Sequence, residues 1–166
     1  MNNKVDNYIS QNSKNKGMFL EYLVIKTIDY YISHDIAWFE KKKTPVKYNY
    51  ANDANTKVKL LKSTIDFYGI YKGKYVALEA KTFEGDKFLI SNLKAHQKEH
   101  LKTINRHQGH SYLIIYSEKT SQIYLLNFSK IENLKIKSLS IEWLNLNAFI
   151  LEIEFPGIVD FLKYLV

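Results

Sequence analysis

The sequence predicts an α/β domain with one mixed central sheet and helices on its flanks. Three observations support this class. Apolar residues recur at three- and four-residue spacing from Lys16 to about Ile32, as in an amphipathic helix. Short runs rich in aromatic and β-branched residues follow, interrupted by a further helical segment at Ala95–Arg106. The 166 residues, of which 46% are hydrophobic and 25% charged, suffice for one domain with its own core.

Each expected element follows from its local pattern. Residues 1–14 are rich in Asn, Lys and Ser, which predicts a disordered arm ahead of a single domain over residues 15–166. Thr64–Tyr71 and Lys74–Lys81 should pair as a hairpin, with Lys72-Gly73 at its tight turn. The other expected elements are strands at Ile36–Glu40, Ser111–Ser117 and Gln122–Asn127, a short strand within Phe83–Leu93, a short helix at Phe128–Leu134, and a final helix opened by Pro156 with Ile158, Phe161, Leu162 and Leu165 on one side.

The apolar residues of the segment 47–62 follow neither helical nor strand periodicity. The segment alternates Lys, Asn and Tyr and contains few large aliphatic residues. A core element needs an apolar face, so this stretch is expected to leave the domain as a long functional loop.

The charge balance favours a polyanionic partner. The chain has 24 basic and 17 acidic residues and a formal net charge of +7. Nucleic acid and an anionic membrane surface both fit this charge. Arg106 is the only arginine, and lysines act as point charges on phosphates whereas base reading relies on arginine forks. Binding by backbone charge or shape is therefore expected, and a merely solubilising lysine surface is the alternative.

Several classes of protein are disfavoured by what the sequence lacks. There is no cysteine, which excludes disulfides and thiolate metal sites and fits a cytoplasmic protein. Met1–Gly17 is polar and lacks the apolar stretch of a signal peptide. No apolar run approaches the roughly 20 residues that span a bilayer, so no membrane-spanning segment is expected, and nucleic acid is the expected partner rather than a membrane.

Asp66 and the triplet Glu79-Ala80-Lys81 form the candidate chemical site. The triplet ends the apolar run Tyr75–Leu78, and residues two apart on a strand share a face, so Glu79 and Lys81 should point the same way. The hairpin turn places Asp66 across from about Glu79, on strands about 4.8 Å apart. Two carboxylates suit Mg²⁺ or Mn²⁺, which can activate a water for phosphodiester hydrolysis. The alternative is a cross-strand salt bridge in which Lys81 neutralises its neighbours.

Five segments in order resemble the RecU family of Holliday junction resolvases, within the PD-(D/E)xK nuclease superfamily. The likeness spans about residues 15–165. The segments are Asn15–Glu21 (family pattern N-R-G-x-x-x-E), Lys43–Val46 (P-T-P-I), Ser63–Tyr71 (S-T-x-D-Y-x-G-x-Y), Gly73–Lys81 (G-x-x-I-x-F-E-A-K) and Asn92–His100 (N-x-x-x-H-Q-x-x-H).

The resemblance implies a restriction-endonuclease-like core from which residues 47–62 protrude as a stalk that enters the junction. It implies that Lys81 stabilises the transition state, and that Glu21 lies near the site, a plain helix-surface glutamate being the alternative. The implied Mg²⁺ ligands, with Mn²⁺ as a substitute metal, are Thr64, Asp66, Glu79 and Gln97.

The expected activity is a Mg²⁺-dependent endonuclease that resolves four-way junction DNA by paired nicks in recombination and repair. A water on the metal would attack in line and leave 5′-phosphate and 3′-hydroxyl ends. A two-fold junction favours a homodimer, and recombination proteins and the nucleoid are the expected surroundings. The candidate phosphate contacts are Lys41, Lys42, Lys57, Lys59, Lys62, Lys72 and Lys74.

The sequence departs from the family at a few positions and leaves alternatives open. Family arginines are lysines or absent at Lys16 and along residues 47–62, Lys43 replaces a proline, and Ile65 stands where the superfamily name has Pro. The same fold could cut duplex or flap DNA, act as a restriction-type enzyme, or bind DNA without cutting it. The 13 tyrosines could serve a pure binding module. His96–His100 also fits the H-x-x-E-H zinc-protease motif.

Overall fold

The computed structural model describes residues 16–43, 46–49, 57–60 and 64–165. Its centre is a six-stranded sheet in the order β1-β4-β5-β7-β8-β10. The strands are β1 (Trp38–Lys41), β4 (Phe67–Tyr71), β5 (Lys74–Phe83), β7 (His110–Ser117), β8 (Gln122–Asn127) and β10 (Phe149–Leu151). Strands β5 and β7 pair in parallel and the other neighbours are antiparallel, so the predicted mixed sheet is confirmed.

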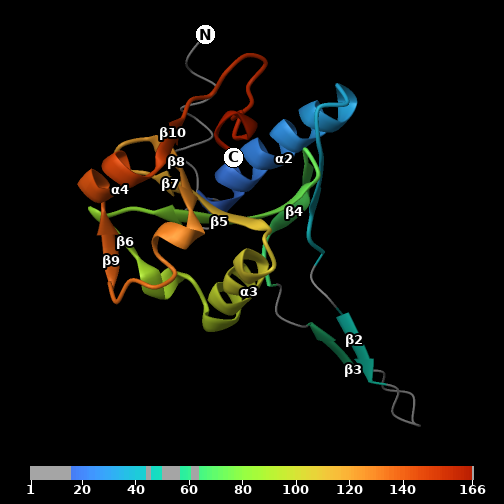
Figure 1. The fold of residues 1–166 in the computed structure, drawn as a ribbon, viewed down its shortest axis with the longest axis horizontal. Coiled ribbons are helices and arrows are strands. Elements are labelled where there is room, and N and C mark those ends of the chain that lie inside the picture. Colours follow the sequence, from blue (N-terminus) through green and yellow to red (C-terminus); the bar gives the residue numbers. More distant parts are fainter. Residues whose placement is uncertain (1–15, 44–45, 50–56, 61–63, 166) are drawn as a thin grey trace.

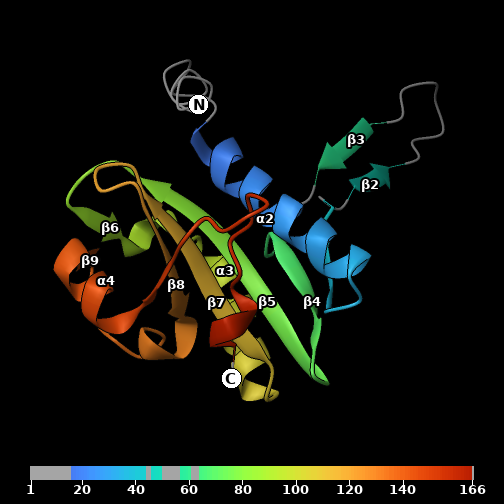
Figure 2. The same cartoon turned by 90° about the horizontal axis from the view of Figure 1, so that it is seen from above.

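Helices cover both faces of this sheet (Figures 1 and 2). Helix α2 (Lys16–Ser33) packs on one face, where its residues Leu20 and Val24 join Phe67, Leu78 and Ile114 in a buried cluster. Helix α3 (Ala95–Arg106) packs on the other face, mainly against β7. Both helices match their predicted ranges. In the described part of the chain, no helix combines the length and apolarity that a membrane crossing requires.

The hairpin β4–β5 has the predicted turn. Lys72 and Gly73 both have positive φ, 48° and 73°, as a tight two-residue turn between right-twisted strands requires. The pairing Phe67↔Leu78 puts Asp66, one residue earlier, across from Glu79 as predicted. The strand boundaries differ, because β4 begins at Phe67 rather than Thr64. Strand β5 continues past Lys81 to Phe83 because its pairing with β7 extends that far.

Residues 47–62 were predicted as a loop, and this is wrong for the part that is described. Strands β2 (Val46–Asn49) and β3 (Lys57–Leu60) pair antiparallel, with Val46 opposite Leu60. Figure 1 shows this two-stranded ribbon projecting away from the main sheet, as the predicted stalk does. A ribbon that stands off the body needs no apolar face, which explains why no period was visible. The predicted arm at 1–14 and Lys62 lie outside the described residues.

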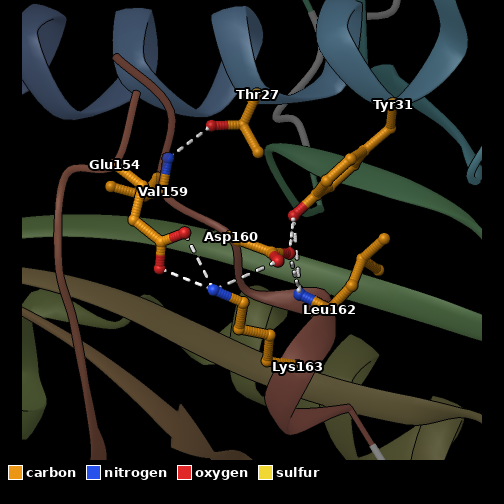
Figure 3. A network of polar contacts seen from close by, with 7 residues as sticks. All are labelled: Thr27, Tyr31, Glu154, Val159, Asp160, Leu162 and Lys163. Atoms are coloured by element: carbon orange, nitrogen blue, oxygen red, sulfur yellow. Dashed lines mark hydrogen bonds and ion pairs between the residues drawn. The ribbon is translucent and has the colours of Figure 1, made fainter. Parts of the chain in front are cut away.

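The helix predicted from Pro156 is also wrong. The chain crosses α2 in an irregular path that ends in a short 3₁₀ turn, η3 (Leu162–Tyr164). The Val159 N–H donates to Thr27 Oγ1 at 2.9 Å, and the Tyr31 hydroxyl donates to Asp160 Oδ1 at 2.7 Å (Figure 3). The side chains of α2 and Asp160 satisfy backbone donors here, and the apolar residues are buried at consecutive positions instead of at helical spacing.

Residues 128–151 form more structure than the sequence indicated. The helix expected at Phe128–Leu134 is only a 3₁₀ turn, η2 (Phe128–Lys130), whose Ser129 N–H is capped by the Asn127 side chain at 3.0 Å. The unpredicted elements after it are β9 (Ser138–Ser140), α4 (Ile141–Asn147) and β10; β9 pairs with β6 (Lys87–Leu89), which is followed by η1 (Ile90–Asn92). Short elements of three to seven residues carry too few periodic positions to be recognised.

Candidate active site

Lys42, Asp66 and Glu79 form a row across three neighbouring strands. The Lys42 N–H, just after β1, donates to the Asp66 carbonyl at 2.7 Å, and Asp66 lies opposite Glu79 on β5. The Asp66 carboxylate is held in place because its Oδ2 accepts the Ala80 N–H at 2.9 Å. The two predicted carboxylates therefore lie side by side at the end of the hairpin away from its turn.

Glu79 is completely buried, on the sheet face that α3 covers. Its Oε1 accepts hydrogen bonds from the Lys81 ammonium, at 2.5 Å, and from the Gln97 amide nitrogen. Its Oε2 is buried and has no hydrogen-bond partner among the described residues. Burying a carboxylate oxygen without a hydrogen-bond donor costs free energy, so this atom is a candidate ligand for a cation.

The pKa of Glu79 is raised to about 7. Burial is the largest cause, and the neighbouring Asp66 charge adds to it, while Lys81 acts in the opposite direction. Two carboxylates that share a poorly hydrated space favour either a bound proton or a bound cation. Near neutral pH, a divalent cation can replace the proton on Glu79.

Ammonium and amide groups contact the other proposed ligands. The Lys42 ammonium donates to Thr64 Oγ1 at 2.6 Å, just as Lys81 donates to Glu79. Gln97 lies in the first turn of α3, and its Oε1 accepts the Lys94 N–H at 3.0 Å, which leaves the amide nitrogen toward Glu79. Gln97 would have to turn its amide over to present oxygen to a cation.

The donor set fits a hard divalent cation. Carboxylate, hydroxyl and amide oxygens are the ligands that Mg²⁺ and Mn²⁺ prefer. Within the described residues there is no group of three or more His, Cys, Asp or Glu side chains able to hold a metal. This also leaves the zinc-protease interpretation without support, since the Glu99 carboxylate pairs instead with Arg106 at 3.0 Å.

The structure separates the remaining predicted residues. Glu21 on α2 pairs with Lys41 at 2.6 Å, on the sheet face opposite to Glu79. Lys72 and Lys74 lie at the hairpin turn, and Lys74 precedes Glu79 by five positions along β5, about 17 Å. Lys57 and Lys59 belong to β3 in the projecting ribbon.

Two other residues of the segment Asn92–His100 lie near the row: sequence reasoning gave Lys94 no role, and it expected His100 to cap the helix or contact phosphate. Lys94 precedes α3 and holds the Gln97 carbonyl through its backbone N–H. His100 lies one turn beyond Gln97 and has a lowered pKa because of burial and the nearby Lys42 charge. The N-x-x-x-H-Q-x-x-H segment marked this helix start, but no sequence signal indicated which neighbours the side chains would contact.

Comparison with known proteins decides the family. The family described as Recombination protein U (RecU) matches residues 15–166. The chain is 44% identical over 151 residues to the Holliday junction resolvase RecU of Mycoplasmopsis pulmonis, covering 91% of this chain and 94% of that one. The chain belongs to the RecU family. The RecU resolvase of Ureaplasma parvum is 34% identical over 157 residues, covering 92% of both chains.

Another RecU relative and a solved structure match a smaller part of this chain. The RecU resolvase of Bacillus cytotoxicus is 40% identical over 121 residues, which cover 68% of this chain and 60% of that one. The structure of Archaeoglobus fulgidus Hjc, a Holliday junction resolvase, superposes with a TM-score of 0.47 and 11% identity over 72% of this chain and 88% of that one. That similarity is too low to support an argument about this member of the RecU family.

Proposed function

We propose that this protein is a Mg²⁺-dependent, structure-selective endonuclease that resolves Holliday junctions by paired nicks. The carrying observation is the adjacent pair of carboxylates, Asp66 and Glu79, with the unpaired buried Oε2 of Glu79 and the ammonium of Lys81 beside them. Membership of the RecU family, whose compared members are named Holliday junction resolvases, supports the choice of junction DNA.

Each residue has a distinct role in this proposal. Asp66, Glu79, Thr64 and Gln97 would hold Mg²⁺, with Mn²⁺ as a substitute, and the bound ion would neutralise phosphate charge and make a water more acidic. Lys81, still 20% exposed, can leave Glu79 for the substrate and stabilise the charge that develops on the scissile phosphate. This chemistry leaves 5′-phosphate and 3′-hydroxyl ends.

The Lys42 ammonium donates a hydrogen bond to Thr64, and Lys42 itself lies beside Asp66 at the end of β1. If Thr64 held the cation, the Lys42 ammonium would be free of this bond and could bind a non-bridging phosphate oxygen at the edge of the site. The other described lysine candidates lie away from the carboxylates, with Lys41 on the opposite sheet face and the rest at the hairpin turn or on β3. Their expected role is to bind the junction arms through their charge. Glu21 can act on this edge only indirectly, through Lys41.

The assembly follows from the substrate. A junction has two-fold symmetry and needs two symmetric nicks, so we propose a homodimer in which each copy contributes one site. In this proposal the ribbon β2–β3, part of a stalk at about residues 47–62, enters the junction centre, and residues 15–166 act as one nuclease domain behind a disordered arm at 1–14. The protein would work in the cytoplasm at the nucleoid, together with recombination proteins.

The test is to separate binding from cleavage. Asp66→Ala and Glu79→Ala should abolish Mg²⁺-dependent nicking of a synthetic four-way junction while junction binding largely survives. Asp86→Ala is a matched control, because Asp86 is an exposed carboxylate whose partner is Lys119; it should leave both activities unchanged. Cleavage retained by either site variant would contradict the proposed mechanism.

A further inference from the structure

The sheet face that carries Glu79 continues outward into a row of apolar side chains. Directly opposed residues of paired strands point to the same face. Trp38 on β1 pairs with Ile70 on β4, and Ile70 pairs with Tyr75 on β5. Tyr75 and Glu79 lie four residues apart on one strand, so this apolar row shares the face of the active-site row.

This row is open to solvent. Trp38 is 46% exposed, Ile70 50% and Tyr75 40%. Helix α3 packs mainly on β7, farther along the sheet (Figure 1). Tyr68, between the two rows, joins the aromatic rings into one surface: its ring centroid is 6.0 Å from that of Trp38 and 6.3 Å from that of Tyr75. We call Trp38, Tyr68, Ile70 and Tyr75 the aromatic platform.

The strand geometry sets the distance from the platform to the candidate active site. Two residues along a strand span about 6.6 Å. Tyr68 therefore lies about 7 Å, and the Trp38–Tyr75 row about 13 Å, from the row of Asp66 and Glu79. A DNA strand that followed β4 from a scissile phosphate at the carboxylates would therefore pass over the platform within its nearest nucleotides.

The chemistry of the platform suits bases or sugars better than phosphates. Aromatic rings stack on bases without regard to sequence. Glu40, the exposed carboxylate of the face, accepts a hydrogen bond from the Tyr68 hydroxyl at 2.9 Å and would repel a phosphate placed there. It would accept an amino group of a base. A cation that could receive the backbone, Lys42, lies at the active-site end of the platform.

We infer that the aromatic platform is a nucleotide subsite, which binds the first or second nucleotide beside the scissile phosphate through ring contacts. The inference rests on the proposed function, because continuity with the candidate active site identifies the occupant as the same DNA strand. It would assign to Trp38 and Tyr75 a positioning role in holding the cut strand.

The test is a double-mutant cycle on a synthetic four-way junction, without divalent metal so that it stays intact. Trp38→Ala should weaken junction binding about tenfold, about 1.4 kcal/mol, and Tyr75→Ala should do the same. An abasic site at the first or second nucleotide beside the mapped cut should weaken wild-type binding similarly but add little to Trp38→Ala. Tyr22→Ala is the matched control, since Tyr22 is 61% exposed on α2, which covers the other sheet face.

A second readout follows the ring itself. The chain has two tryptophans, so Trp143→Phe leaves Trp38 as the single fluorophore, and junction binding should quench its fluorescence. Thermal melting should show that Trp38→Ala and Tyr22→Ala both remain folded, because neither side chain belongs to the two buried clusters.

The outcomes separate the subsite from the proposed function. If the wild type nicks junctions in Mg²⁺ but Trp38→Ala binds like Tyr22→Ala, the subsite is overturned and the function stands. Trp38→Ala could instead change the oligomeric state and leave the DNA affinity unaltered when variant and wild type are compared in the same oligomeric state. The platform would then be a protein interface, and the subsite would again be overturned. If the wild type neither binds nor nicks junctions, the proposed function and the subsite are both overturned.

Discussion

Glu79→Gln should stabilise the metal-free protein in alkaline solution. The pKa of Glu79 is about 7 in the folded protein against an ordinary value of 4.5, mainly because of burial. Each pKa unit corresponds to about 1.4 kcal/mol, so ionising Glu79 costs the folded state about 3 kcal/mol. The raised pKa means that this cost is absent below about pH 4.5, grows as the pH rises to about 7, and is complete above it. Glutamine cannot ionise and avoids the cost.

The assay is urea unfolding of the wild type and Glu79→Gln at pH 4.5 and pH 8, in the presence of a chelator. The two proteins should match at pH 4.5, and the variant should be more stable at pH 8 by up to about 3 kcal/mol, or roughly 6–12 °C in Tm. Glu152→Gln, at an exposed glutamate, is the control and should change stability by less than about 0.5 kcal/mol at either pH. The reasoning would be refuted if the free energy of unfolding of the two proteins changed with pH in the same way, or if the variant were less stable than the wild type at pH 8.

Three further predictions concern separate parts of the molecule. Lys81→Met should lower the junction cleavage rate by roughly 10²–10³-fold with little change in binding, and an unchanged rate in a single-turnover assay would exclude its role. Tyr31→Phe removes the donor to Asp160 and should cost about 1–2 kcal/mol in urea unfolding, whereas Tyr22→Phe should cost nothing measurable. Deleting residues 50–60 should lower the preference for junction over linear duplex in competition binding, and an unaltered preference would refute the stalk assignment.

The sequence predicted the elements whose residues repeat a period over many positions. Helix α3 matches the predicted range from Ala95 to about Arg106, and the tight Lys72-Gly73 turn fixed the hairpin register that sets Asp66 opposite Glu79. The prediction of a final helix was wrong because Thr27 and Tyr31, about 130 residues away in the chain, form hydrogen bonds with Val159 and Asp160 and hold this segment in an irregular path. Local periodicity cannot report such long-range hydrogen bonds.

The candidate site was predictable as a set of residues but not as a set of contacts. The hairpin register brings Asp66 and Glu79 together, and Gln97 entered only through the resemblance to a family. The orientation of the Gln97 amide and the bond from Lys42 to Thr64 depend on how α3 and β1 pack on the hairpin. The aromatic platform was missed for the same reason, since its rings come from three strands that only the sheet order places side by side.

The most direct test of the central claim is metal-dependent nicking by the wild-type protein of a synthetic four-way junction, compared with matched duplex, flap and single-stranded DNA. We expect paired, symmetric nicks in the junction in Mg²⁺ or Mn²⁺, none in a chelator, and little cleavage of the other three substrates. Equal cleavage of duplex or flap DNA, or nicking that persists in the chelator, would contradict a metal-dependent junction resolvase.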